Sequence, residues 1–373
     1  MTSSSGGTVV LGTVVAATGE RGHRVAANVN GTTLWYESPD TALDEGPEGL
    51  AGAMVLPALT QHKRLVIEDA VSGTWLANIE RAIAVWNDWW GYPMLVPSPS
   101  ALAEPRERGS GTALCFSGGL DSFHSLLTAP TTPDVLAFLH GFAVRPDNHD
   151  LAGKCEAMLR DVATEVGARG VLLRTNLVEH PLFARANGIH AVGGGYAAIG
   201  HVLSNQVGTL IISSSFSHAQ PVPVEHRFGT HWELDPLMSS DRLEVVHYGA
   251  DSTRIDKLRA VADNSLVHRH LRVCNRGGLT NCSQCDKCVL TIAIIHALGG
   301  DPARFEVFDW STTVVDRLDH LHRTLYLNTY ADILDLDITP AMAAAVRALL
   351  DRSRPPQPSL LQRAARWTGR RRR

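Results

Sequence analysis

The feature that most constrains the fold is a regular alternation of strand-like and helix-like segments in the middle of the chain. β-prone runs begin at Thr112, Asp134, Arg169 and Thr209, and longer segments with helical character separate them. Strands that alternate with helices build βαβ units, which form a parallel sheet with helices on both faces. The sequence therefore predicts an α/β fold with a parallel sheet.

Shifts in composition divide the 373 residues into four predicted parts. Short β-prone runs and a helix that Ser72 can cap indicate a small α+β domain, and the Pro- and Ser-rich stretch 97–111 is interpreted as a linker after it. The parts are a small domain at 1–105, the parallel-sheet domain at 106–300, a helical extension at 301–355, and a basic, disordered tail at 356–373.

Composition excludes several classes of protein. The chain is 44% hydrophobic and has a formal net charge of −4. This charge gives no net electrostatic attraction to nucleic acid or to an anionic membrane. No apolar run approaches the roughly 18 residues of a membrane span, and the N-terminus lacks the features of a secretory signal. We expect a cytoplasmic protein with no membrane partner.

A glycine turn follows the first strand of the α/β region. Residues 117–122 read Ser-Gly-Gly-Leu-Asp-Ser and lead into a helix. Glycines let backbone N–H groups approach an anion, and a helix N-terminus adds partial positive charge, so the turn can bind phosphate. Neither the Walker lysine pattern nor the dinucleotide pattern Gly-x-Gly-x-x-Gly is present. A purely structural turn is the alternative.

This motif resembles the pyrophosphate loop of the PP-loop ATP pyrophosphatases. The resemblance implies that the turn holds the β- and γ-phosphates of ATP, that ATP is cut between its α- and β-phosphates, and that Mg²⁺ assists. Asp121 is then a metal-side residue, or otherwise an acid favoured by the helix dipole. The ATP-binding residues expected from this resemblance are Ser117, Gly118, Gly119, Leu120, Asp121, Ser122, His140, Arg174 and Thr175. A second glycine stretch, 193–195, precedes a predicted helix and adds Gly194 as a nucleotide contact, with close packing as the alternative.

Four of the six cysteines form a tight cluster. Cys274, Cys282, Cys285 and Cys288 have the spacing Cys-x₇-Cys-x₂-Cys-x₂-Cys. Four thiolates suit tetrahedral Zn²⁺ in a closed, structural site. An iron–sulfur cluster is the alternative, although the ferredoxin continuation is absent. Cys115 and Cys155 are interpreted as buried thiols.

The glycine turn followed by this cluster resembles the 7-cyano-7-deazaguanine synthases of queuosine biosynthesis, over about residues 110–300. The segment 252–262, Ser-Thr-Arg-Ile-Asp-Lys-Leu-Arg-Ala-Val-Ala, is similar to a Thr-Lys-bearing helix of that family. The resemblance implies adenylation of a 7-deazaguanine carboxylate, displacement of AMP by ammonia, and ATP-dependent dehydration of the amide to a nitrile.

The chain also departs from that family. Arg254 stands where the family has lysine, with Lys257 one helical turn further on, and the chain carries extra residues at both ends. The family's substrate loop has no residue-by-residue match in the polar stretch 213–240, where His231, Glu233 and Asp235 are candidate contacts to substrate or Mg²⁺. Side chains that only tie the loop to itself are the alternative. We infer a relative with a changed substrate.

These observations predict an AMP-forming, ATP-dependent C–N ligase. Asp121, Ser122, Arg254 and Lys257 are the expected catalytic residues, with ATP as co-substrate and Zn²⁺ and Mg²⁺ as cofactors. The acyl-adenylate of a small carboxylate would be captured by ammonia, an amine, or a protein or peptide acceptor. A homodimer is expected, and nucleic acid is not an expected partner. The alternatives are a sulfur transferase that thiolates tRNA or a small molecule, and a regulatory nucleotide-binding module.

Overall fold

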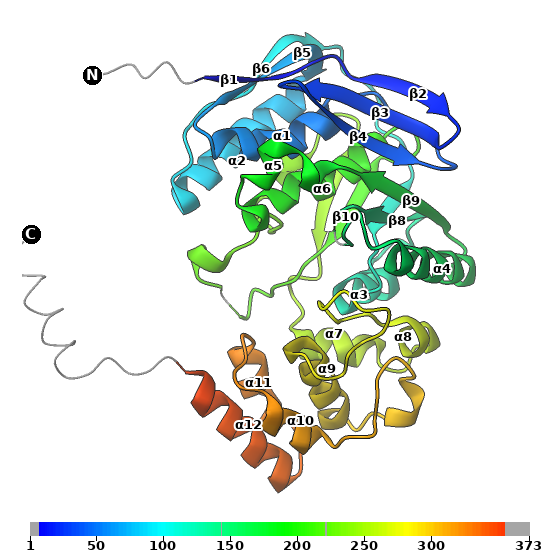
Figure 1. Cartoon of the computed structure of the whole chain (residues 1–373), viewed down its shortest axis with the longest axis vertical. Helices are drawn as coiled ribbons and strands as arrows, with labels where there is room; N and C mark the ends of the chain where they lie inside the picture. Colours follow the sequence, from blue (N-terminus) through cyan, green and yellow to red (C-terminus); the bar gives the residue numbers. More distant parts are fainter. Residues whose placement is uncertain (1–6, 143, 221, 355–373) are drawn as a thin grey trace, which may run out of the picture. The chain divides into compact units, whose positions relative to one another are not determined.

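The computed structural model describes residues 7–142, 144–220 and 222–354. The predicted basic tail at 356–373 lies outside these residues. Contacts divide the chain into two compact units (Figure 1). One unit contains the residues up to Asn281 together with Ala303–Phe308, and the other contains Cys282–Pro302 and the residues from Asp309 onward.

The predicted parallel sheet is present in the first unit. Its strands are β7 (Thr112–Cys115), β8 (Val135–His140), β9 (Arg169–Thr175), β10 (Thr209–Ser213) and β11 (Glu244–Tyr248). They lie in the order β11-β10-β7-β8-β9, and each neighbouring pair is parallel. The expected α/β class with a mostly parallel central sheet is therefore confirmed.

The N-terminal residues continue this sheet, so the structure divides the chain differently from the predicted boundary at residue 105. β9 pairs antiparallel with β4 (Thr32–Ser38), where Tyr36 lies opposite Thr175. Asn176 strengthens the junction, because its Oδ1 accepts from the Trp35 N–H at 3.0 Å. Beyond β4 the 11-stranded sheet continues through β3 (Gly22–Val29), β1 (Thr8–Leu11), β5 (Arg64–Ser72) and β6 (Ser98–Ala103), while β2 (Val15–Gly19) pairs with β3.

The predicted linker contains the last of these strands. β6 pairs in parallel with β5 and ends the sheet. Pro99 is tolerated there because an edge strand can leave its N–H side unpaired. The composition that indicated a linker therefore belongs to an exposed edge strand.

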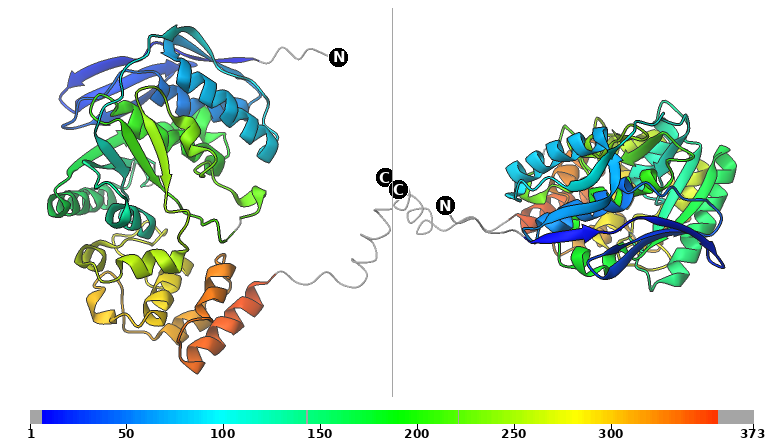
Figure 2. Two further views of the ribbon diagram at one scale, coloured as in Figure 1. Left: turned by 180° about the vertical axis from the view of Figure 1, so that it is seen from behind. Right: turned by 90° about the horizontal axis from the view of Figure 1, so that it is seen from above.

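Helices cover both faces of the sheet (Figure 2). On one face α1 (Glu48–Leu59) packs on α6 (Gly188–Val202), next to α2 (Gly73–Trp90) and the short α5 (Pro181–Ala184). Ser72 caps α2 as predicted, since its Oγ accepts from the Trp75 N–H at 3.2 Å. The other face carries α3 (Leu120–Thr128), α4 (His149–Val166) and α7 (Arg254–Val261), with α8 (Ser265–His270) following in the chain.

The second unit is helical in its described residues. It contains α9 (Asp286–Ala297), α10 (Val314–His320), α11 (Leu327–Ile333) and α12 (Pro340–Ser353). Asp286 ties two parts of this unit together, because its carboxylate accepts from the Thr324 hydroxyl at 2.9 Å and from the Leu325 N–H at 3.0 Å. Within the described ranges of the chain, no helix has the length and apolar character needed to cross a membrane.

Candidate functional site

A cavity of about 140 Å³ lies at the carboxyl ends of the parallel strands. The strand order reverses beside β7, because the chain runs from β7 to β8 on one side and returns through α6 to β10 on the other. Open α/β sheets bind ligands at such a switch point. The lining residues are Cys115, Phe116, Ser117, Gly119, Asp121, Ser122, Ala137, Phe138, Leu139, Tyr196, Ile199, Ile212, Ser213, Ser215 and Thr230.

The predicted glycine turn forms one wall of this cavity. Gly119 is the N-cap residue of α3, so the first amide groups of this helix have no acceptor within the helix and can bind an anion. The Ser122 hydroxyl donates to the Gly119 carbonyl at 2.9 Å, and the Ser117 Oγ accepts from the Gly119 N–H at 3.4 Å. The two serines therefore shape the turn itself.

Gly118 can only be glycine without strain. Its φ is +71°, in the left-handed region that side chains rarely adopt. A Cβ at this position would also collide with the Met158 sulfur of α4. The Gly118 carbonyl accepts from the Arg272 N–H at 2.7 Å, which ties the turn to the segment that follows α8.

Lys257 lies beside Asp121, in the first turn of α3. Its Nζ lies 3.0 Å from the Asp121 Oδ1 and also donates to the Ser214 carbonyl. The lysine side chain is only 3% exposed, whereas the carboxylate of Asp121 is 26% exposed. The structure thus brings together two of the predicted catalytic residues, from helices α3 and α7.

Arg254, the other predicted basic residue, is the first residue of α7, one turn before Lys257. The capping box between Thr253 and Asp256 fixes this helix start, with the Thr253 Oγ1 accepting from the Asp256 N–H at 3.2 Å. The cavity lining includes neither Arg254 nor Lys257. The expected contacts of both residues with phosphate therefore stay predictions.

His124 lies beside the Asp121–Lys257 pair and was missed in the sequence. It is 5% exposed, and a Cβ added to Gly249 would lie 3.1 Å from its Nδ1 and 3.7 Å from the Lys257 Cε. Burial, together with the charge of Lys257, lowers the pKa of His124. Both effects favour the neutral imidazole at this position. No sequence motif around His124 marks it as a functional residue.

Three predicted nucleotide contacts, His140, Arg174 and Thr175, lie at the ends of β8 and β9. None of them is among the residues that line the cavity. The Nε2–H of His140 donates to the Arg145 carbonyl at 3.1 Å, and burial lowers the pKa of His140. Arg174 is its register partner on β9. The Thr175 hydroxyl donates to the Trp35 carbonyl at 2.8 Å, so this side chain joins β9 to β4. The sheet accounts for Thr175 without a nucleotide.

Gly194 needs a correction. The sequence was interpreted as a glycine stretch before a helix, but α6 begins at Gly188, where Asn187 caps it. Gly194 is therefore inside the helix, and a Cβ there would collide with the Gly52 carbonyl of α1. It permits close packing of α1 on α6, and the predicted nucleotide contact does not fit this position.

The predicted substrate loop covers the carboxyl edge of the sheet and contains two short 3₁₀ helices, η2 (Val224–His226) and η3 (Asp235–Met238). Thr230 from this loop lines the cavity. His231 is 2% exposed, and its Nδ1 accepts from the Glu233 N–H at 3.2 Å. Burial, with the nearby charges of Arg227, His247 and His218, lowers the pKa of His231 to about 3.

Aromatic residues at the end of α2 hold this loop. The Arg227 guanidinium lies 4.4 Å from the centre of the Trp89 ring, and that ring meets His231 edge-on at 4.7 Å. The Trp90 indole N–H donates to the Val224 carbonyl at 3.2 Å. Glu233 is 48% exposed and 3.8 Å from Arg227, so its nearest charge is within the loop.

Asp235 is buried against a residue that the sequence did not single out. Its Oδ2 lies 2.6 Å from the His247 Nδ1 of β11, and the two side chains are 0% and 3% exposed. Burial raises the pKa of Asp235, while the hydrogen bond from His247 opposes that shift. His247 lies in a strand with no motif around it, so only the fold could reveal it.

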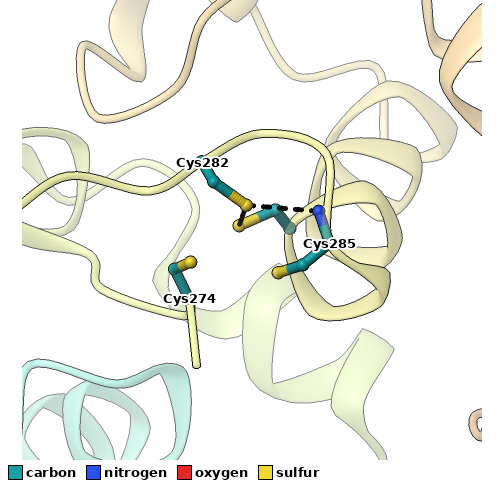
Figure 3. Close-up of side chains that lie close together, drawn as sticks. Cys274, Cys282 and Cys285 are labelled. Carbon is teal, nitrogen blue, oxygen red and sulfur yellow. Dashed lines mark hydrogen bonds between the residues drawn. The ribbon is translucent and has the colours of Figure 1, made fainter. Parts of the chain in front are cut away.

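The four clustered cysteines form a candidate metal site, as predicted. Their sulfur atoms all lie within 4.8 Å of one another, and those of Cys282 and Cys288 are 4.0 Å apart. Figure 3 shows Cys274, Cys282 and Cys285 of this cluster close together. A tetrahedral zinc–thiolate site with Zn–S bonds of about 2.3 Å has sulfurs about 3.8 Å apart. The Cys285 N–H donates to the Cys282 sulfur at 3.2 Å, a contact that orients this thiol.

The cluster therefore fits a metal ion. Contact with Cys285, together with burial, raises the pKa of Cys288, so metal binding has to displace its proton. The remaining cysteines are separate from the cluster: Cys155 is buried in α4, and Cys115 ends β7 in the cavity wall.

Comparisons of the chain with protein-family models, with curated proteins and with solved structures found no match.

Proposed function

We propose that the protein is an AMP-forming, ATP-dependent ligase that activates a carboxylate as its acyl-adenylate and transfers the acyl group to ammonia or another amine. One observation carries this proposal. The Ser117–Ser122 turn opens a helix at the switch point of the parallel sheet and faces a cavity, with Lys257 held beside Asp121. An anion-binding turn without a Walker lysine suits a leaving pyrophosphate better than a transferred γ-phosphate.

Lys257 supplies the positive charge in this arrangement. It extends from α7 towards the turn, so its charge can stabilise phosphates that the α3 amides bind. An ammonium ion has three N–H donors, and two of them are defined here, to Asp121 and to Ser214. The third is available in this proposal to a phosphate oxygen that becomes more charged as pyrophosphate leaves.

Mg²⁺ would sit at Asp121, which is the one carboxylate in the cavity lining. When bound, the ion would neutralise charge on the phosphates. The lining also contains Phe138, Leu139 and Tyr196, whose apolar surfaces suit a base or another flat ring. The four cysteines would hold Zn²⁺ as a structural ion, because a set of four thiolates leaves no open coordination position.

A sulfur transferase with the same nucleotide site is the second candidate, and Cys115 is the residue that favours it. Its thiol lines the cavity, where a sulfur carrier would have to act. Burial, and to a smaller degree the charge of Asp235, raises the pKa of this thiol. A protonated thiol is a poor sulfur carrier, so the ligase ranks first.

The test is the exchange of labelled pyrophosphate into ATP with a panel of carboxylates, headed by 7-carboxy-7-deazaguanine. A ligase shows exchange that depends on the acid. Exchange that depends instead on tRNA and a sulfur donor would favour the sulfur transferase. No exchange under either condition would contradict both.

A further inference from the structure

We propose that His247, oriented by Asp235, takes the proton from the amine when the acyl-adenylate is captured. This inference rests on the proposed function and adds a base to its second step. The first observation is an unsatisfied atom: within the described residues, the buried His247 Nε2 has no hydrogen-bond partner. A buried polar atom without a partner costs about 1–3 kcal/mol. Other buried atoms of the described residues, such as the His124 Nδ1, share this property, so the inference rests on what surrounds His247.

The partner of the other ring nitrogen fixes what this atom can do. The proposal requires Asp235 to be ionised, the form that the hydrogen bond from His247 favours against the effect of burial. An ionised carboxylate only accepts hydrogen bonds, so in this form the contact of 2.6 Å places the ring proton on Nδ1. The Nε2 then carries a lone pair and can accept a proton. Asp235 would also stabilise the imidazolium that results, as the carboxylate does in other carboxylate–histidine pairs.

Further hydrogen bonds hold Asp235 in place. Its own N–H donates to the His231 carbonyl at 2.8 Å, and its Oδ1 accepts from the His231 N–H at 3.4 Å. The carboxylate is completely buried, and the 3₁₀ helix η3 carries it. These contacts fix its orientation towards His247. A base with a fixed orientation is what a proton transfer requires.

The pair lies behind residues that line the cavity, and the lining itself includes neither His247 nor Asp235. His247 is the register partner of Ile212, and paired residues of neighbouring strands project from the same face of a sheet. Ile212 itself lines the cavity. Thr230, next to His231 in the loop that carries Asp235, lines it as well. The pair is therefore at the same edge of the sheet as the proposed adenylate site.

The step balances without another reactant. The amine nitrogen attacks the acyl carbon, a C–N bond forms, and the bond from that carbon to the AMP oxygen breaks. AMP leaves with the electron pair, and one N–H proton passes to the His247 Nε2. Adenylation itself needs no such base, since the carboxylate is already the nucleophile.

That difference gives the test. We would compare His247→Gln and Asp235→Asn with the wild type in two assays that use 7-carboxy-7-deazaguanine: pyrophosphate exchange, and amide formation with ammonium in a single turnover. His226→Gln is the matched control, because His226 is exposed on the same loop. Circular dichroism and thermal unfolding first establish that each variant is folded.

We expect amide formation to fall about 10²-fold or more in both variants, as when a general base is lost, while exchange changes less than about threefold. His226→Gln should leave both rates unchanged. Equal losses in both assays would mean that the pair only supports the loop, and unchanged amide formation would also overturn the inference. If the wild type shows exchange without amide formation, capture by an amine is wrong but adenylation stands. An acid of the panel that does support exchange replaces 7-carboxy-7-deazaguanine in both assays if that compound gives none. If the wild type shows no exchange with any acid of the panel, the proposed function fails, and this inference fails with it.

Discussion

The Nζ of Lys257 lies 3.0 Å from the Oδ1 of Asp121, although the two residues are 136 positions apart in the sequence. This contact joins the first turn of α3 to α7 and, through the Ser214 carbonyl, to the start of the loop after β10. One buried ammonium group therefore connects the glycine turn, the helix that follows β11 and the covering loop.

Replacing Lys257 by methionine should weaken both the fold and the proposed reaction. The change removes the donor to Asp121 and Ser214, which we expect to lower the free energy of unfolding by about 1–3 kcal/mol. Loss of a preorganised charge at the phosphates should slow pyrophosphate exchange about 10²-fold or more.

Arg259→Gln is the control for this substitution. Arg259 is on the same helix, but its pair with Asp256 is about half exposed on both sides (51% and 47%). Such surface pairs contribute about 1 kcal/mol at most. Urea denaturation and the exchange assay would compare the two variants, and equal effects would contradict a special role for Lys257.

Gly118→Ala tests the geometry of the turn. The variant has to adopt φ near +71° and to place a methyl group against the Met158 sulfur. Gly167 has a φ of +72° with no atom close to its missing Cβ, so Gly167→Ala measures the cost of the backbone conformation alone, about 1–2 kcal/mol.

We expect Gly118→Ala to cost more than Gly167→Ala in denaturation experiments, and the difference to shrink when Met158→Ala is combined with it. Equal costs in the two glycine variants would show that Met158 does not limit the turn.

Four of the five parallel strands, β7 to β10, could be predicted because strands and helices alternate there with clear periods. The fifth, β11, is not among the predicted strands. Two other elements gave no such signal. α1 is buried at all but its first position, so it has no polar face and no helical period in its hydrophobic residues. β6 contains Pro99 and mostly exposed residues, which made an edge strand resemble a linker.

The residues of the candidate site likewise fall into those that the sequence could predict and those that it could not. The glycine turn and the four cysteines are local patterns, so the sequence alone identified them. His247 and His124 are placed by strand pairing and helix packing, which no spacing records. Gly194 was misassigned because the helix start was placed too late, although Asn187 was present as a capping residue.

The role of Gly194 can be tested by stability rather than by ligand binding. Gly194→Ala puts a methyl group against the Gly52 carbonyl and should lower the free energy of unfolding by about 1–3 kcal/mol, as overpacking does. Gly188, the first residue of the same helix, has open space at its Cβ position, so Gly188→Ala should be neutral or slightly stabilising. A loss of nucleotide affinity without a loss of stability would restore the original interpretation.

The cysteine cluster predicts one bound metal ion per chain. Elemental analysis of the purified protein should find zinc, and Cys282→Ser or Cys285→Ser should lose it together with the thermal stability that the ion provides. Cys155→Ser is the control, because Cys155 is buried in α4 away from the cluster. Iron with a charge-transfer absorption would identify an iron–sulfur cluster instead.

The buried His231 should make the fold sensitive to acid. Its pKa is lowered to about 3 in the folded protein, from about 6.5 in the unfolded chain. Between these values the unfolded chain binds the extra proton, so His231 costs no stability above pH 6.5 and destabilises the fold progressively as the pH falls towards 3. At pH 4.5 this loss is about 3 kcal/mol relative to pH 7.

His231→Asn cannot be protonated in this range and keeps an acceptor for the Glu233 N–H. Its free energy of unfolding should therefore fall less steeply than that of the wild type in urea titrations between pH 7 and 4.5. The exposed His226→Gln should follow the wild-type curve, and parallel curves for His231→Asn and the wild type would show that His231 is protonated without cost.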